Sequence, residues 1–164
     1  MKRLLPLLIL LMIFSGCSLQ KQENTATFYY PRVKYEYNTA DGVIGHELRN
    51  TGDIYAAQEL LDLYLQGPLS EELAMPFPGD MSVIHVSNDG HTIFITVSDN
   101  LATLSGAPLI LACSCLGRTA IALCNVESAE IRCENLLLDG KRTITVNADT
   151  IIYADSITQI KIVE

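Results

Sequence analysis

Positive charge is scarce in this sequence. Its 164 residues include 11 Lys and Arg against 19 Asp and Glu, which gives a formal net charge of -8. Nucleic-acid phosphates and anionic lipid head groups both attract basic surfaces. We therefore expect no nucleic-acid partner, and no membrane attachment through charge alone.

Long hydrophobic runs are missing after residue 16. The longest apolar stretch, residues 109–124, is interrupted by residues that are small, polar or charged: Ser114, Gly117, Arg118 and Thr119. A transmembrane helix needs about 20 consecutive, predominantly apolar residues. We therefore expect this stretch to form a packed helix rather than a membrane span.

Patterns typical of catalysis are missing as well. Asp53, Glu59 and Asp62 belong to the solvent face of a predicted helix, whereas a glycosidase needs two carboxylates that face each other across a cleft. Ser98 and Ser105 have no neighbours that resemble a nucleophile elbow. We expect no catalytic residues and no cofactor, and we interpret the chain as a protein without enzymatic activity.

The three histidines do not converge on a metal site. In the predicted hairpin His85 and His91 point to opposite faces, and His46 lies in another segment. One zinc ion needs ligands that lie together around it. We therefore expect no metal-ligating residues.

The N-terminus, by contrast, carries a sorting pattern. Lys2 and Arg3 precede the apolar run Leu4–Phe14, and Ser15-Gly16-Cys17 follows it. This arrangement resembles a bacterial lipoprotein signal peptide, in which the thiol of Cys17 receives a diacylglyceryl group and Cys17 becomes the mature N-terminus. An ordinary secretory signal and a short uncleaved anchor are the alternatives, although the run is short for a membrane span.

The predicted domain organisation follows from this cysteine. Residues 1–16 form the signal peptide, residues 17–30 the lipidated N-terminus and a flexible tether, and residues 31–164 a single domain. Cleavage leaves 148 residues, with a net charge of about -10 because Lys2 and Arg3 are lost. We expect this domain at the extracytoplasmic face of the cell membrane, attached through the lipid on Cys17.

Hydrophobic periodicity predicts two helices and several strands. The predicted elements are strands at 32–37 and 43–49, a helix from Asp53 to Gly67-Pro68, a hairpin of residues 81–88 and 91–98, a helix from Pro108, a strand with Ala129, Ile131 and Cys133 facing inward, and strands at 143–146, 150–153 and around Ile160 and Ile162. We expect an α+β fold, a mixed β-sheet with two helices packed on one face. The helix from Pro108 would connect parallel strands. One face of this helix is expected to be buried: Leu109, Ala112, Cys113, Leu116, Ala120, Leu123 and Cys124.

The dipeptide Asp89-Gly90 predicts the register of the hairpin. As the centre of a type I′ turn, it would place Val86 opposite Ile93 and Ile84 opposite Ile95. Four branched side chains would then cover one face.

Several segments resemble the GerMN domain family. They lie within residues 30–155 and are Leu60-Leu61 through Gly67-Pro68, the proline-containing loop that follows, Ile95-Thr96-Val97-Ser98, Leu104-Ser105-Gly106 and Asp149-Thr150-Ile151-Ile152. The family is known from lipoproteins and membrane proteins connected with sporulation and spore germination in Gram-positive bacteria. The resemblance implies a fold similar to the ring-building motif domains of secretion systems, and no catalytic set. Thr96 departs from the family, which usually has Asp there, and so do Cys113 and Cys115.

Besides Cys17 the chain has four cysteines, Cys113, Cys115, Cys124 and Cys133. The first two are two positions apart on a predicted helix, so their side chains point about 200° apart and cannot bridge each other. The strand after the helix runs back along it, which places Cys133 beside Cys113. We expect a buried thiol pair of Cys113 and Cys133, either bonded or as small buried hydrophobes.

These patterns predict a lipid-anchored, extracytoplasmic binding or scaffolding module of the cell envelope. Its expected partners are envelope proteins or further copies of itself, and the resemblance implies a link to sporulation or germination. Tyrosine is favoured at interfaces, so the candidate contact patch consists of Tyr29, Tyr30, Tyr35 and Tyr37.

Two other classes of function remain as alternatives. An envelope enzyme or small-molecule binder acting on cell-wall material would use a cleft between the proline-rich loop and the helix from Pro108. A redox role would require an exposed pair of cysteines that readily form thiolates.

Overall fold

The structure is a computed structural model, and it describes residues 24–136, 142–156 and 159–163. The predicted signal peptide and Cys17 lie outside these residues. The described helices and strands are β1 (Thr25–Pro31), β2 (Ile44–Asn50), α2 (Ala57–Tyr64), β3 (Val83–Asn88), β4 (Thr92–Val97), the 3-10 helix η1 (Asp99–Thr103), α3 (Gly106–Cys124), β5 (Ser128–Arg132), β6 (Thr143–Asn147), β7 (Ile151–Ser156) and β8 (Gln159–Val163).

The described strands form three sheets. Four of them pair in the order β3-β4-β5-β6, in which β4 and β5 are parallel and the other neighbours are antiparallel. The pairs β1–β2 and β7–β8 are antiparallel and separate. The α+β class and the parallel connection around α3 are therefore confirmed, although the strands are divided among three sheets rather than joined in one.

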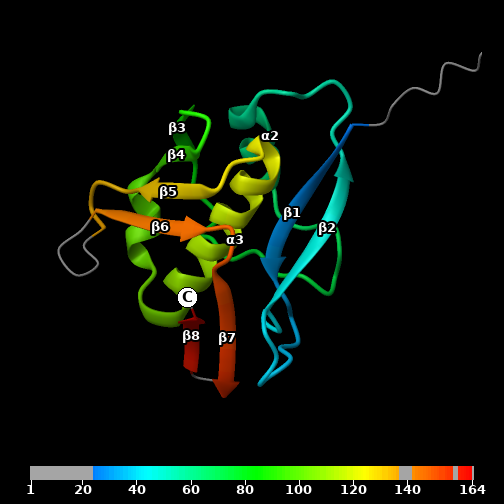
Figure 1. Cartoon of the computed structure of the whole chain (residues 1–164), viewed down its shortest axis with the longest axis vertical. Helices are drawn as coiled ribbons and strands as arrows, with labels where there is room; N and C mark the ends of the chain where they lie inside the picture. Colours follow the sequence, from blue (N-terminus) through cyan, green and yellow to red (C-terminus); the bar gives the residue numbers. More distant parts are fainter. Residues whose placement is uncertain (1–23, 137–141, 157–158, 164) are drawn as a thin grey trace, which may run out of the picture.

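Helix α3 lies between the four-stranded sheet and the β1–β2 pair (Figure 1). Its predicted core residues are buried in the main core: Leu109, Ala112, Cys113, Leu116 and Ala120. The prediction of a single buried face was wrong, because Leu111 and Cys115 are buried in a second core with residues of β2 and β7. Leu123 and Cys124, at the C-terminal end of the helix, are only partly buried.

By length and composition alone, α3 could cross a membrane. In this fold it is instead packed on two sides, as the core helix of a globular domain is. Its close packing depends on Gly117, where an added Cβ would lie only 2.6 Å from the Cβ of Val146 on β6. The missing side chain therefore sets the distance between the helix and the sheet.

The β3–β4 hairpin turns one residue later than predicted. Val86 lies opposite Ile95, two residues beyond the partner that we predicted. Gly90 has a φ of 94°, and the Asp89 carboxylate accepts a hydrogen bond from the His91 N–H at 2.9 Å. Glycine thus takes the first central position of the two-residue turn, which is what a type II′ turn requires.

A β-bulge changes the outer strand of this hairpin. It lies between Val83 and His85, and it leaves Ile84 63% exposed instead of facing Ile95. A bulge of this kind shifts the alternation of inward and outward side chains by one residue. Ile93 and Ile95 are buried on the apolar face of the hairpin as predicted, Val83 and Val97 join them there, and Ile84 does not. Val86 is partly buried against the same core.

The first strand begins earlier than predicted. Phe28 and Tyr30 on β1 are fully buried, so residues 25–30 belong to the folded domain and not to the tether. Residues 33–37, which we expected to form a strand, lie in a loop after β1. Helix α2 starts after Ala56, so Asp53 does not cap it. The other predicted strands are present as β2, β5, β6, β7 and β8.

Candidate binding surface

A groove follows the segment after β1. Two adjoining hollows of about 420 and 560 Å³ share Arg32, Val33 and Lys34 in their walls. We call their union the tyrosine groove, and its further lining residues are Pro31, Tyr35, Glu36, Tyr37, Glu71, Glu72 and Ala74. Residues 31–37 of its lining begin at the C-terminal end of β1 and continue into the loop that leads to β2, a path that Figure 1 shows.

The backbone fixes both walls of the tyrosine groove. The N–H of Val33 donates to the carbonyl of Glu72 at 2.8 Å, and the N–H of Ala74 donates to the carbonyl of Pro31 at 2.9 Å. Between these two hydrogen bonds, Leu73 of the proline-rich loop forms an isolated antiparallel bridge with Arg32. The predicted cleft partner of this loop was the helix from Pro108, but the facing wall comes from residues 31–37 instead.

Apolar and aromatic side chains are exposed at this groove. Val33 is 57% exposed and Tyr37 is 39% exposed. The rings of Tyr35 and Tyr37 meet edge to face, with centroids 6.2 Å apart, and partial burial raises the pKa of Tyr35. Rigid aromatic side chains with one wet edge are typical of protein contact surfaces.

The predicted tyrosine patch divides into two parts. Tyr35 and Tyr37 line the groove, whereas Tyr30 is fully buried and its hydroxyl donates to the carbonyl of Tyr64 at 2.7 Å. Burial raises the pKa of Tyr30 far above its ordinary value. Tyr29 is partly buried. Only half of the predicted patch therefore forms part of the groove.

The groove also holds cations that have no carboxylate partner. Among the described residues, Arg132 and Arg142 both pair with Glu134, at 2.6 and 2.9 Å. Arg32 and Lys34 form no ion pair with any described residue, and the Arg32 Nε donates instead to a backbone carbonyl of β2 at 3.2 Å. The groove therefore offers free positive charge beside the carboxylates in its walls.

A buried ion pair supports the loop that forms one wall. Arg49 is 8% exposed; it pairs with the Glu47 carboxylate and donates to the carbonyl of Gly67 at 2.7 Å. Glu47 accepts hydrogen bonds from the N–H groups of Leu69 and Ser70, at 3.0 and 3.1 Å. We did not predict this pair, although two positions of separation in a strand place both side chains on one face.

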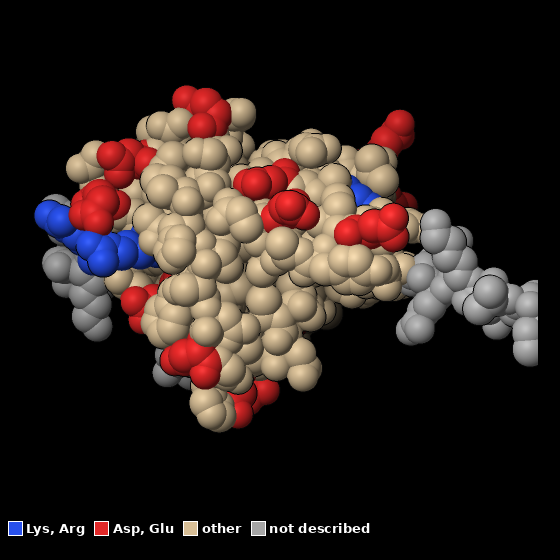
Figure 2. All heavy atoms as spheres, turned by 90° about the horizontal axis from the view of Figure 1, so that it is seen from above, with Lys and Arg blue, Asp and Glu red and all other residues tan. Residues whose placement is uncertain are grey.

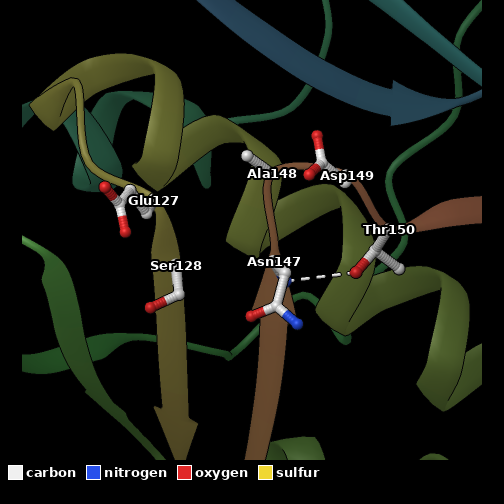
Figure 3. A pocket seen from close by; sticks show the side chains of 6 residues that line it. All are labelled: Glu127, Ser128, Asn147, Ala148, Asp149 and Thr150. Atoms are coloured by element: carbon white, nitrogen blue, oxygen red, sulfur yellow. Dashed lines mark hydrogen bonds between the residues drawn. The ribbon is translucent and has the colours of Figure 1, made fainter. Parts of the chain in front are cut away.

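Apart from the tyrosine groove, a hollow of about 530 Å³ lies where β5 begins and β6 ends (Figure 3). Its lining residues are Glu127, Ser128, Asn147, Ala148, Asp149 and Thr150. The Asn147 N–H donates to the Thr150 hydroxyl at 3.1 Å, and the Glu127 side chain is 84% exposed. The six residues include two hydroxyls, of Ser128 and Thr150, and two carboxylates, of Glu127 and Asp149.

The predicted thiol pair lies in the main core. Cys113 and Cys133 are 1% and 0% exposed, and the four described cysteines are free thiols. Burial, and secondly the proximity of Cys133, raises the pKa of Cys113 to about 12. Burial also raises the pKa of Cys115. Redox-active cysteines are exposed and have lowered pKa values, so these thiols have the character of structural residues.

The histidines are dispersed over the surface. His46 packs against Tyr29, with ring centroids 5.8 Å apart, and His91 lies 3.9 Å from the Glu127 carboxylate. Within residues 24–136, 142–156 and 159–163, no group of three His, Cys, Asp or Glu residues could hold a metal ion. On the face seen in Figure 2, acidic side chains are dispersed and basic ones gather mainly at one margin.

Comparisons with known proteins give one distant structural likeness. No protein-family model matches the chain, and no curated protein matches its sequence. The crystal structure of a "putative lipoprotein" from Clostridium perfringens is similar, with a TM-score of 0.48 and 18% sequence identity over 79% of this chain and 90% of that chain. A likeness at this level does not assign a function. The resemblance to the GerMN family therefore stays a prediction.

Proposed function

We propose that this chain is a lipid-anchored, extracytoplasmic binding module of the cell envelope, which contacts a protein partner through the tyrosine groove. The lipid would sit on Cys17, because the residues around it have the pattern of a lipoprotein signal peptide. The GerMN resemblance connects the module with sporulation or spore germination. We propose no catalytic activity and no cofactor.

The observation that carries the binding role is the exposure of Val33 and Tyr37 in a hollow shared with Arg32 and Lys34, neither of which pairs with a carboxylate of the described residues. A partner that covers these side chains removes apolar area from water, which contributes about 25 cal/mol per Å². Charged groups around the apolar centre supply orientation and specificity more than affinity. The groove therefore suits a protein segment with an apolar anchor and charged flanks.

Attachment is tested by metabolic labelling of cells with an alkyne fatty acid. The wild-type chain should carry the label, and the Cys17→Ala variant should not. A label that persists in Cys17→Ala, or an unlabelled wild-type chain, would overturn the lipid anchor.

Binding is tested by site-specific photo-crosslinking in intact cells during growth and sporulation. A photoreactive amino acid at Val33 should give a discrete adduct, whose partner is identified by mass spectrometry. Ile84 is the matched control, because it is 63% exposed and lies outside the groove. Equal adducts from both positions, or none from Val33, would contradict a binding role for the groove.

A further inference from the structure

The tether enters the domain at a fixed point. The side-chain amide of Asn24 donates to the Gly52 carbonyl at 2.9 Å and to the Tyr55 hydroxyl at 2.8 Å. The backbone carbonyl of Asn24 accepts hydrogen bonds from the backbone N–H and the side-chain hydroxyl of Thr51, at 2.8 and 3.1 Å. Asn24 is therefore clamped against the turn between β2 and α2.

This point is close to Cys17 along the chain. Seven peptide units separate the two residues, and a fully extended chain of that length spans about 25 Å. The clamp at Asn24 thus keeps one end of the domain within about 25 Å of the lipid, provided that Cys17 is lipidated as proposed above.

The surface around the clamp is mainly uncharged. A hollow of about 420 Å³ is lined by Asn24, Thr25, Ala26, Thr27, Thr51, Ile54, Tyr55, Leu60, Ala122 and Leu123. We call this surface the tether pole. Tyr55 is 71% exposed there, and Ala122 is also exposed. No lining residue carries a charge, in a chain whose net charge is -8.

We infer that the tether pole rests on the membrane surface, with the ring of Tyr55 in the lipid head-group region. Tyrosine is enriched at such interfaces because its ring is apolar and its hydroxyl remains in contact with water. The contact is with zwitterionic or neutral lipid groups, because the exposed carboxylate of neighbouring Asp53 and the acidic chain as a whole repel anionic ones. The inference rests on the lipid anchor proposed for Cys17.

The orientation that follows exposes the tyrosine groove to possible partners. Strand β1 runs from Thr25 at the tether pole to Pro31 at the groove, which is about 20 Å at 3.3 Å per residue. The two surfaces lie at opposite ends of this strand (Figure 1). With the tether pole on the lipid, the groove faces away from the membrane.

The absence of tryptophan makes the contact measurable. The natural chain contains none, so Tyr55→Trp introduces a single fluorescent reporter. The lipidated protein would be reconstituted into phosphatidylcholine vesicles with and without brominated acyl chains. Bromine quenches a tryptophan only at short range, so quenching should be at least about twofold stronger for a tryptophan at the interface than for one in water.

Two further variants make the result decisive. Ala122→Trp lies on the same pole and leaves the bond between Asn24 and Tyr55 intact, so it should be quenched like Tyr55→Trp. Tyr37→Trp, in the tyrosine groove, is the control that should remain unquenched. Equal quenching of all three variants, or of none, would overturn the inference. So would a blue-shifted emission of Tyr55→Trp without vesicles, because another part of the chain or a second copy would then cover the pole.

Flotation of the vesicles separates the two proposals. If the protein floats with the vesicles but the tryptophan at position 55 is not quenched, the anchor stands and the contact at the tether pole is wrong. If mass spectrometry finds no lipid on Cys17 and the protein does not float, the proposed anchor is wrong and the inference fails with it.

Discussion

The guanidinium of Arg118 on α3 makes a two-pronged hydrogen bond with the carboxylate of Asp41, with distances of 3.0 and 2.8 Å. Asp41 lies in the loop between β1 and β2, and its carboxylate also accepts the N–H of Ile152 on β7 at 2.9 Å. Arg118 donates in addition to the carbonyl of Thr150. One ion pair thus joins a loop, a helix and a strand that are far apart in the sequence.

Replacing Asp41 should therefore destabilise the whole domain. Asp41→Asn removes the charge but suits the left-handed backbone there, where φ is 56°. We expect the free energy of unfolding to fall by about 2 kcal/mol for Asp41→Asn, and further for Asp41→Ala, because Arg118 is left buried without its partner. Urea unfolding would measure both changes.

An exposed ion pair provides the matched control. The side chains of Arg132 and Glu134 are 55% and 51% exposed, and exposed pairs contribute about 0–1 kcal/mol. Arg132→Ala should therefore change the free energy of unfolding far less than Asp41→Asn does. Similar losses in the two variants would show that the Asp41–Arg118 pair has no special role.

Gly117→Ala should destabilise the domain even though it improves helix propensity. Alanine favours a helix over glycine by about 1 kcal/mol, but the new Cβ would lie 2.6 Å from the Cβ of Val146. Overpacking of this kind costs about 1–3 kcal/mol. We expect a net loss of about 1 kcal/mol in urea unfolding.

Shortening the facing side chain should offset this loss. In the double variant Gly117→Ala, Val146→Ala, the clash with the valine methyl groups disappears, so the two changes should cost less together than the sum of the single variants. Simple additivity would contradict the close contact between α3 and β6.

Alkaline pH should destabilise the domain. The folded pKa of Cys113 is raised from 9.0 to about 12 by burial, so the unfolded chain loses this proton at a lower pH than the folded one. The contribution of the protonated Cys113 thiol to the free energy of unfolding is fully present below pH 9 and is lost as the pH rises toward 12. For one such group the free energy of unfolding should fall by about 3 kcal/mol by about pH 11.

Removing the thiol should flatten this pH dependence. Cys113→Val has no group that titrates, so its unfolding free energy should fall less steeply above pH 9 than that of the wild type. Cys124→Val is the control, because Cys124 is only partly buried and its pKa is raised only moderately by burial. Parallel curves for wild type and Cys113→Val would show that other groups cause the loss.

Local pattern predicted the elements better than their exact pairing. The apolar alternation of Ala129 and Ile131 and the periodicity of α3 are confirmed in the core. The hairpin was predicted as a hairpin, but its register depends on the side-chain hydrogen bond of Asp89 and on the bulge beside Ile84. The register and the bulge depend on contacts between particular atoms, and the spacing of apolar residues in the sequence does not reveal these contacts.

The candidate site was predicted only in part. Tyr35 and Tyr37 were predicted as contact residues because they are tyrosines. Residue type alone does not distinguish these exposed or partly exposed side chains from the buried Tyr30. The opposite wall forms because Leu73 pairs with Arg32, and a contact between distant segments has no local signal. The prediction of the lipid site at Cys17 rests on residues that are adjacent in the sequence, so it does not depend on the tertiary structure.

Strand β1 has a mechanical consequence, because it connects the two surfaces directly. A pull between Asn24 and Val33 runs along the covalent backbone of a single strand, instead of through the hydrogen bonds that hold β1 to β2. Tension between the membrane and a captured partner would then load the peptide bonds of β1 first. The helices and the four-stranded sheet would bear little force while the partner remains bound.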